Sequence, residues 1–238
     1  QWIYASFMAA RPHLTDTLDE NVRRPEWTRY LLDQCDSPDG SAVNVTVTGS
    51  KGKGSTSVML AAMLRAYGYK VGLFTSPHLF HFTERIRVNG VKIPDACFVR
   101  LANKVKEVAV PLQKELRLNE YISPIGLTAV IAALYFQEQG TDINIWECGR
   151  GARYDDVNQI THQAAVITPI MTEHTKQLGA RLEDVAKHKF AVITPAVRTV
   201  CIGWQHECVQ QLVQQRDRIW QGREVVCLGR DFHVTDVQ

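Results

Sequence analysis

The chain has 238 residues, of which 45% are hydrophobic and 22% are charged, enough for one substantial α/β domain with a full core. Its formal net charge is +2 and its lysines and arginines are dispersed, so neither a nucleic acid nor a membrane surface is expected as a partner. No stretch of the sequence approaches the roughly 20 consecutive apolar residues of a membrane span.

The six cysteines contain no C-x-x-C pair, so the sequence suggests neither a zinc knuckle nor a dithiol redox motif. Three of them, Cys148, Cys201 and Cys227, lie inside apolar runs, as small buried hydrophobic residues do. Free thiols of this kind are typical of a reducing compartment, so we expect a cytoplasmic protein.

Segments of two kinds alternate along most of the chain. Short apolar runs bounded by glycine, proline or aspartate predict strands, whereas longer segments with apolar residues three and four positions apart predict helices. In chain order the predicted elements are a helix over 26–35, a turn over 36–41, a strand over 43–48, a helix over 53–67, a strand over 70–74, a long loop to 90, a short strand or loop edge over 91–93, helices over 94–116 and 124–140, strands over 142–147 and 164–168, a helix over 182–190, a strand over 199–203, a helix over 206–220 and a strand over 224–228.

The predicted strands are almost wholly apolar, a pattern typical of a mostly parallel sheet covered by helices on both faces. We expect a single α/β domain over residues 1–238, since no repeat or low-complexity linker interrupts the pattern. In such sheets ligands bind beyond the carboxyl ends of the strands. The polar residues that follow predicted strands are Ser50, Ser76, Glu147 and His174.

A glycine-rich segment, TVTGSKGKGSTS, joins the predicted strand over 43–48 to the helix that follows it. Its glycines allow a tight turn whose N–H groups face phosphate oxygens at a helix N-terminus, and Lys53 can reach a β- or γ-phosphate. The spacing is GxxGKGS rather than the common GxxxxGK[ST], and a flexible turn before an ordinary helix is the alternative. The predicted nucleotide-binding residues of this phosphate loop are Gly49, Ser50, Lys51, Gly52, Lys53, Gly54, Ser55 and Thr56.

Four further segments show a resemblance to a known family. They read LFTSPHLFHFTERIRVNG (73–90), ECGRGARYDDVNQI (147–160), RLEDVAKHKFAVITPAV (181–197) and LGRDF (228–232). Together with the phosphate loop they resemble the folylpolyglutamate and dihydrofolate synthases, which belong to the wider Mur ligase family. The resemblance runs from Arg24 to Phe232 and implies the central domain of a Mur ligase, with a P-loop NTPase-like fold. Members of the family normally add a smaller C-terminal domain. Because this chain ends before such a domain would begin, we expect either a truncated chain or a protein that works without that lobe.

The resemblance also implies ATP and Mg²⁺ as cofactors and assigns roles to single residues. Ser76 and Glu147 match Mg²⁺ ligands, and His174 matches a ligand of a second Mg²⁺. Lys189 matches a lysine that forms a carbamate with CO₂ and helps to hold that second ion. On pattern alone, Glu147 suits Mg²⁺ at a strand tip but could be a solvated strand end. For Ser76, His174 and Lys189 the alternatives are a turn hydroxyl, a structural histidine and a solvated helix lysine.

The acid-binding half of the implied site departs from the family pattern. Asp155 and Asn158 keep the acid and the amide of the family's D-A-T-N element, and we expect Asp155 to contact substrate and Asn158 to contact the nucleotide. Residues 122–128 stand where the family has T-Y-F-E-x-L-T, and they lack its two aromatics and its acid. A lost stacking ring removes about 1 kcal/mol of specific contact. The ATP half is therefore expected to be retained and the folate half altered.

The function implied is an ATP-dependent amide ligase. ATP would phosphorylate a substrate carboxylate, and an amino acid such as glutamate would attack the acyl phosphate, with Lys53, His174 and Lys189 as the catalytic residues. The partners would be a small carboxylic acid and an amino acid. A related ligase for a non-folate acid, and a nucleotide-binding module that partners another subunit, are the alternatives. A generic P-loop ATPase would explain the phosphate loop but not the other segments.

Overall fold

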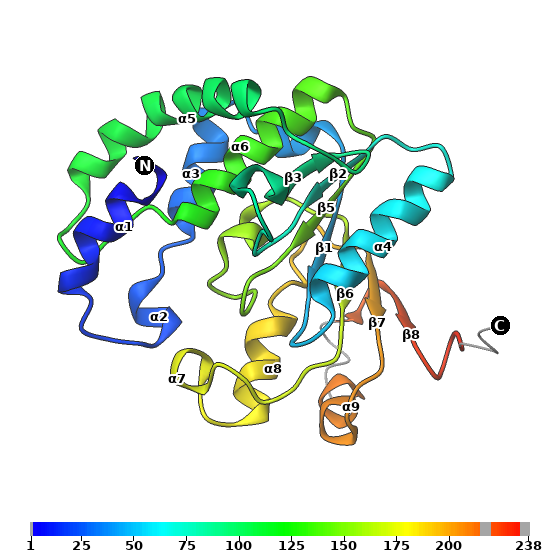
Figure 1. The fold of residues 1–238 in the computed structure, drawn as a ribbon. Coiled ribbons are helices and arrows are strands. Elements are labelled where there is room, and N and C mark those ends of the chain that lie inside the picture. Colours follow the sequence, from blue (N-terminus) through cyan, green and yellow to red (C-terminus); the bar gives the residue numbers. More distant parts are fainter. Residues whose placement is uncertain (1, 215–219, 234–238) are drawn as a thin grey trace.

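The computed structural model describes residues 2–214 and 220–233 of the chain. Within these residues eight strands form one sheet, in the order β4-β3-β2-β5-β1-β6-β7-β8 (Figure 1). The strands are β1 (Val43–Thr48), β2 (Val71–Phe74), β3 (Ile86–Val88), β4 (Val91–Lys92), β5 (Ile143–Glu147), β6 (Ala164–Ile167), β7 (Thr199–Ile202) and β8 (Glu224–Cys227).

The predicted mostly parallel sheet is confirmed, and the ends of its parallel strands lie within one residue of the predicted ones. The prediction of a continuous loop between residues 75 and 90 is wrong, because β3 lies within it and pairs antiparallel with β2 and β4. A strand of three residues offers too little alternation to be recognised in a sequence, and it is the pairing with β2 that orders it.

The helices predicted after residue 25 are present, with ends that shift by at most one residue where they are described. The predicted helix over 206–220 is helical from Glu207 to Gln214, and residues 215–219 lie outside the described part of the chain. No helix of the described residues is long and apolar enough to cross a bilayer. The α-helices are α1 (Ala5–Ala10), α2 (Asp19–Val22), α3 (Glu26–Gln34), α4 (Lys53–Ala66), α5 (Asp95–Glu115), α6 (Pro124–Gln139), α7 (Thr175–Leu178), α8 (Leu182–Phe190) and α9 (Glu207–Gln214).

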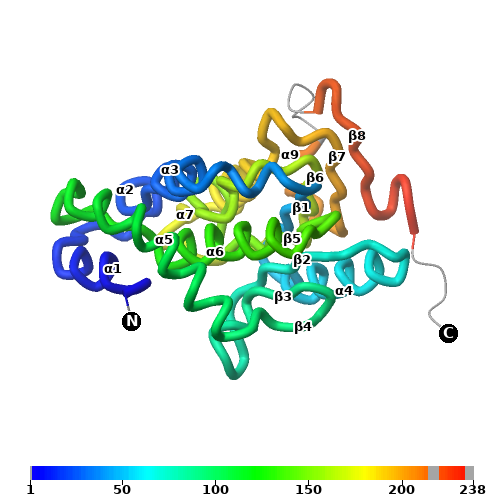
Figure 2. Tube along the Cα trace, turned by 90° about the horizontal axis from the view of Figure 1, so that it is seen from above, coloured from blue at the N-terminus to red at the C-terminus, as the bar shows by residue number. Residues whose placement is uncertain are grey.

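Helices cover both faces of the sheet, as predicted. On one face α4 packs against β1, β2 and β5 over Val47, Leu73 and Ile145. On the other face α6 lies against β2 and β3, and α3 and α5 pack on its outer side, as the view from above shows (Figure 2). Since α6 is enclosed between these layers, its residues from 126 to 136 are all buried. Its limits follow from local chemistry, because Ser123 Oγ caps its N-terminus and Gly140 adopts φ +59° just beyond its end.

The topology brings distant segments together at one edge of the sheet. Strand β1 lies between β5 and β6, and all three run parallel, so their carboxyl ends meet. The phosphate loop after β1, the acid that ends β5 and the segment after β6 are therefore neighbours, and α8 lies beside them (Figure 1). This is the edge at which ligands of open α/β sheets bind.

A buried ion pair ties α3 to the start of the sheet and gives a first testable prediction. Asp39 is 2% exposed and accepts hydrogen bonds from Arg29 Nη1 at 2.8 Å and from the Thr161 N–H at 2.9 Å. Burial alone would raise the pKa of Asp39, but these hydrogen bonds outweigh it, so the pKa lies below its ordinary value. Asp39→Asn is expected to lower the free energy of unfolding by about 2 kcal/mol near neutral pH.

Since the folded-state pKa of Asp39 is lowered, its contribution is complete above the ordinary aspartate pKa and is lost as pH falls through the lowered value. Urea unfolding of the wild type and of Asp39→Asn, at about pH 7 and at about pH 2, measures how much stability Asp39 contributes at each pH. Asp33→Asn is the matched control. Asp33 pairs with the same Arg29 at 2.7 Å but is 55% exposed, so this change is expected to cost at most about 0.5 kcal/mol. An equal loss of unfolding free energy in Asp39→Asn and Asp33→Asn would contradict the stabilising role given to the buried Asp39.

Candidate functional site

The phosphate loop is held in place by the segment that follows β6. The Ser50 N–H donates to the carbonyl of Pro169 at 2.8 Å. Its hydroxyl donates to the carbonyl of Met171 at 3.1 Å and accepts from the N–H of the same residue at 2.9 Å. Gly52, with φ +80°, makes the last turn before α4. The predicted strand, loop and helix are thus present, with the N–H groups of the first turn of α4 at the loop.

Lysines from two helices converge on one carbonyl of this loop. Lys53, in the first turn of α4, donates from Nζ to the carbonyl oxygen of Gly49 at 2.9 Å. Lys189, in the last turn of α8, donates to the same oxygen at 2.7 Å. Two cationic groups therefore lie at the phosphate loop, where they favour an anionic ligand.

Lys189 is fully buried, so the alternative of a solvated helix lysine is wrong. Besides Gly49, its Nζ donates to the carbonyl of Arg150 at 3.2 Å and pairs with Oε1 of Glu173 at 2.9 Å. Burial lowers the pKa of Lys189 below its ordinary value, and the carboxylate of Glu173 opposes this shift. The acid next to His174 is therefore the direct partner of Lys189.

Glu147 and Ser76 meet across a pocket that opens in front of the phosphate loop. The Ser76 N–H donates to Oε2 of Glu147 at 2.9 Å, and Glu147 is 5% exposed. Burial raises the pKa of Glu147, while the Ser76 N–H and the charge of Lys53 act in the opposite direction. A Cβ at Gly54 would lie 3.3 Å from Oε1 of Glu147, so the glycine lets the carboxylate approach the start of α4. The pocket has a volume of about 690 Å³ and is lined by Gly52, Gly54, Ser55, Val58, Met59, Thr75, Ser76, Pro77, Leu79, Arg87 and Glu147.

The donors in this phosphate pocket fit Mg²⁺. The largely buried carboxylate of Glu147 and the hydroxyl of Ser76 are hard oxygen ligands of the type that Mg²⁺ binds together with phosphate oxygens. The structure does not bring His174 to them. His174 is exposed, with φ +49° just before α7, and the described residues contain no group of three or more acids, cysteines or histidines placed to hold a metal.

Asp155 and Asn158 make internal contacts. The Asp155 carboxylate is 1% exposed, accepts from the N–H groups of Gly149 and Val157 at 3.0 Å each, and lies 3.6 Å from Arg23. Burial raises the pKa of Asp155, and Arg23 opposes the shift. Asn158 Nδ2 donates to the carbonyl of Ala191, the residue directly after α8, at 3.1 Å. Its Oδ1 is buried and has no partner among the described residues.

A second pocket, of about 370 Å³, lies beside the segment that departs from the family pattern. The rings of Phe7 and Tyr121 meet edge to face there, with centroids 5.2 Å apart. Sequence reasoning pointed to residues 122–128 here but missed Phe7 and Tyr121, because they come from an N-terminal helix and from the segment just before those residues. The aromatic pocket, as we call it, is lined by Tyr4, Phe7, Arg23, Tyr121, Ser123, Pro124, Ile125 and Arg150.

Comparison with known proteins gives one consistent result. The Mur ligase middle domain matches residues 47–220. The dihydrofolate synthase/folylpolyglutamate synthase of Bacillus subtilis is 34% identical over 193 residues, which are 80% of this chain and 44% of that protein. The protein of the same name from Escherichia coli is 34% identical over 148 residues, which are 62% of this chain and 33% of that protein.

Solved structures agree with the sequence comparison. Folylpolyglutamate synthase of Mycobacterium tuberculosis complexed with ADP and AMPPCP superposes with a TM-score of 0.82 at 27% identity, covering 91% of this chain and 50% of that one. An FPGS–AMPPCP–folate complex superposes with a TM-score of 0.80 at 29% identity, covering 89% of this chain and 51% of that one. The chain thus spans about half of the length of these solved structures, and it spans 44% and 33% of the length of the two curated relatives.

Proposed function

Because the chain belongs to the Mur ligase family, we propose that it is an ATP-dependent amide ligase of the folylpolyglutamate synthase type. The observation that carries the proposal is the convergence of Lys53 and Lys189 on the carbonyl of Gly49, next to the buried carboxylate of Glu147. A generic ATP-binding turn would need the phosphate loop and Lys53 but not a buried lysine from α8.

The proposed reaction has two steps. In the first, a carboxylate oxygen of the acid attacks the γ-phosphorus of ATP, and the bond to the β,γ-bridging oxygen breaks so that ADP leaves with the electron pair. In the second, the amine of the amino acid attacks the acyl carbon. The bond between the acyl carbon and the phosphate oxygen breaks, phosphate leaves with the electron pair, and the nitrogen loses a proton. Lys53 and the N–H groups of the loop would hold the β- and γ-phosphates in line and oppose their charge.

Ser76 and Glu147 would hold Mg²⁺ at the phosphates, where the ion supplies charge neutralisation. His174 and Lys189 are proposed for a second ion, with Lys189 as a carbamate. Formation of that carbamate requires a neutral amine, and the buried position of Lys189 favours it by lowering the pKa. It also requires that Lys189 give up its ion pair with Glu173.

The acid is proposed to bind in the aromatic pocket. One relative has been solved as a complex with AMPPCP and folate, and a planar ring is the feature of such an acid that aromatic side chains recognise. Tyr4, Phe7 and Tyr121 supply rings here, although residues 122–128 lack the aromatics of the family pattern. We therefore propose a carboxylic acid with a planar ring system, either a folate or a non-folate acid. Glutamate is the proposed amino acid. The free thiols of the six cysteines fit a reducing compartment, and we propose the cytoplasm.

The test is the release of ADP from MgATP by the full chain, measured with a panel of aromatic carboxylic acids that includes folates, with and without glutamate. We expect release that depends on both the acid and the amino acid. Lys53→Ala is expected to weaken MgATP binding about 10- to 100-fold, since it removes a charge-assisted contact to phosphate. Lys106→Ala, an exposed lysine on α5, serves as the control and is expected to change nothing. ADP release that never depends on an amino acid would refute the ligase function.

A further inference from the structure

Arg85 is a buried cation without a counter-ion. It ends the 3₁₀ helix η4 (Phe82–Arg85), within the segment over 73–90 that resembles the family, and it is 8% exposed. Among the described residues no carboxylate lies within ion-pair distance of it. Within the described part of the chain, the one hydrogen bond of its side chain runs from Nε to Nδ1 of His78 at 3.1 Å, and Nη1 is buried without a partner there.

The neighbours of Arg85 compensate only partly for its burial. The guanidinium lies over the ring of Phe82, 5.0 Å from the centroid, which gives a weak attraction and no charge neutralisation. His78 accepts from Arg85 through Nδ1 and brings no negative charge to it. Burying a charge without a partner is costly, so such an arrangement gains most from an anionic ligand.

Arg85 lies between the two pockets of the candidate site. On one side, its carbonyl accepts from the Thr75 N–H at 2.9 Å, and the next residue, Ser76, binds Glu147 in the phosphate pocket. On the other side, the ring of Phe82 meets that of Tyr4, with centroids 6.3 Å apart, and Tyr4 lines the aromatic pocket. Burial lowers the pKa of Arg85, and its electrostatic interactions with the Tyr4 hydroxyl and the Glu147 carboxylate oppose this shift.

We propose that Arg85 binds the acyl phosphate group where it forms, between the ring of the acid and the phosphate loop. The inference rests on the proposed function and assigns a residue to it. The acyl phosphate forms when the carboxylate of the acid takes the γ-phosphoryl group from ATP and ADP leaves. This anion must span both pockets, so it needs a cation between them. Displacement of the His78 ring uncovers the guanidinium. His78 is partly exposed and its neighbours Leu79 and Phe80 are 83% and 84% exposed, so the ring borders solvent.

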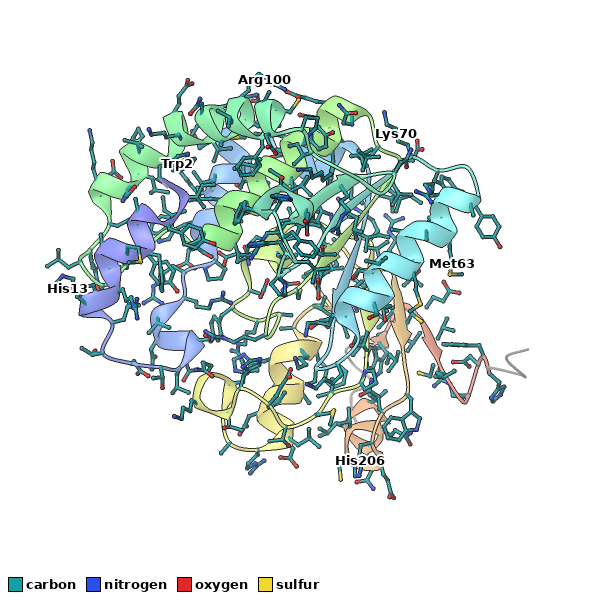
Figure 3. The ribbon with its side chains drawn as sticks, viewed as in Figure 1. Trp2, His13, Met63, Lys70, Arg100 and His206 are labelled. Carbon is teal, nitrogen blue, oxygen red and sulfur yellow. The ribbon has the colours of Figure 1, made fainter. Side chains whose placement is uncertain are left out.

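The test uses acetonylphosphonate, a stable methylene analogue of acetyl phosphate, titrated into the full chain in the presence of MgADP. We expect Arg85→Met to weaken its binding at least about tenfold, and Arg85→Lys, which keeps the charge, to weaken it less. Arg100→Met is the matched control, because Arg100 lies on α5 at an outer edge of the molecule (Figure 3), is 57% exposed and pairs with Glu138. MgADP affinity is expected to stay the same in all three variants.

Unfolding without ligand separates this role from a structural one. Since Arg85→Met removes an uncompensated buried charge, its midpoint of thermal unfolding is expected to equal or exceed that of the wild type. A lower midpoint together with unchanged affinity for the phosphonate, in Arg85→Met and Arg85→Lys alike, would show that Arg85 is a structural cation. If the wild type failed to bind MgADP, the proposed function would fall and this role with it, whereas normal MgADP binding with unchanged phosphonate affinity overturns the role alone.

Discussion

Replacing Gly49 by alanine is expected to abolish MgATP binding and to lower the free energy of unfolding by about 3 kcal/mol. A Cβ on Gly49 would lie 1.9 Å from Oγ1 of Thr168 and 2.8 Å from its carbonyl oxygen. Thr168 cannot retreat, because its N–H donates to the carbonyl of Thr48 at 2.8 Å and holds the end of β6 against β1. The backbone of Gly49 also has φ +137°, a conformation that disfavours a side chain.

Urea unfolding and calorimetric titration with MgATP measure the two effects of Gly49→Ala separately. Gly40→Ala is the control, since a Cβ on Gly40 would meet nothing within 4 Å and the residue lies outside the site. It is expected to change the free energy of unfolding by less than about 1 kcal/mol and to leave MgATP affinity unchanged. If Gly49→Ala bound MgATP as the wild type does, the loop would not have the tight packing described for it.

Replacing Lys189 by methionine is expected to cost about 3 kcal/mol of stability and to reduce acid-dependent ADP release at least about tenfold. Methionine fills similar space but donates no hydrogen bond. It leaves the carbonyls of Gly49 and Arg150 without this donor and Glu173 without its ion pair. Because Gly49 belongs to the phosphate loop, part of the loss of activity has the same origin as the loss of stability, and the missing amine accounts for the rest.

A double variant tests whether the ion pair accounts for that cost. Lys189→Met combined with Glu173→Gln removes both charges, so it is expected to recover about half or more of the stability lost in Lys189→Met. Urea unfolding of the four proteins in the cycle gives the coupling energy. The activity is expected to stay low, since the amine is still missing. No recovery of stability would mean that the hydrogen bonds to the two carbonyls, rather than Glu173, make up the cost.

Most of the longer elements between residues 43 and 190 follow from local signals in the sequence. Helix α6 begins at the Ser123-Pro124 pair and ends before Gly140, and both signals can be read without knowledge of the fold. Strand β3 could not be predicted, since its three residues are ordered by pairing with β2. The N-terminal helices α1 and α2 were missed for a similar reason, because their short segments are held by contacts with distant parts of the chain, such as the hydrogen bond from the Ile122 N–H to Ser6 Oγ.

The candidate site could be predicted where one segment contains both the backbone and the side chain that matter. The phosphate loop is such a segment, and the structure has its predicted strand–turn–helix arrangement. The partners of Lys189 could not be predicted, because Gly49 lies 140 residues away and Glu173 reaches Lys189 only through the turn before α7. The contact of Asp155 with substrate stays a prediction, and in the structure its oxygens accept hydrogen bonds from N–H groups of its own loop. Local sequence identifies an acid, and only the fold shows which donors already use it.

The shared carbonyl of Gly49 also bears on whether this phosphate loop could be moved into another protein. The loop takes its shape from Pro169 and Met171 beyond β6 and from Lys189 at the end of α8, none of which is near it in sequence. A graft of residues 49–56 alone would carry the glycines and Lys53 but none of these supports. The loop is therefore not a portable module, and evolution could alter its geometry by substitutions more than a hundred residues away without touching the motif itself.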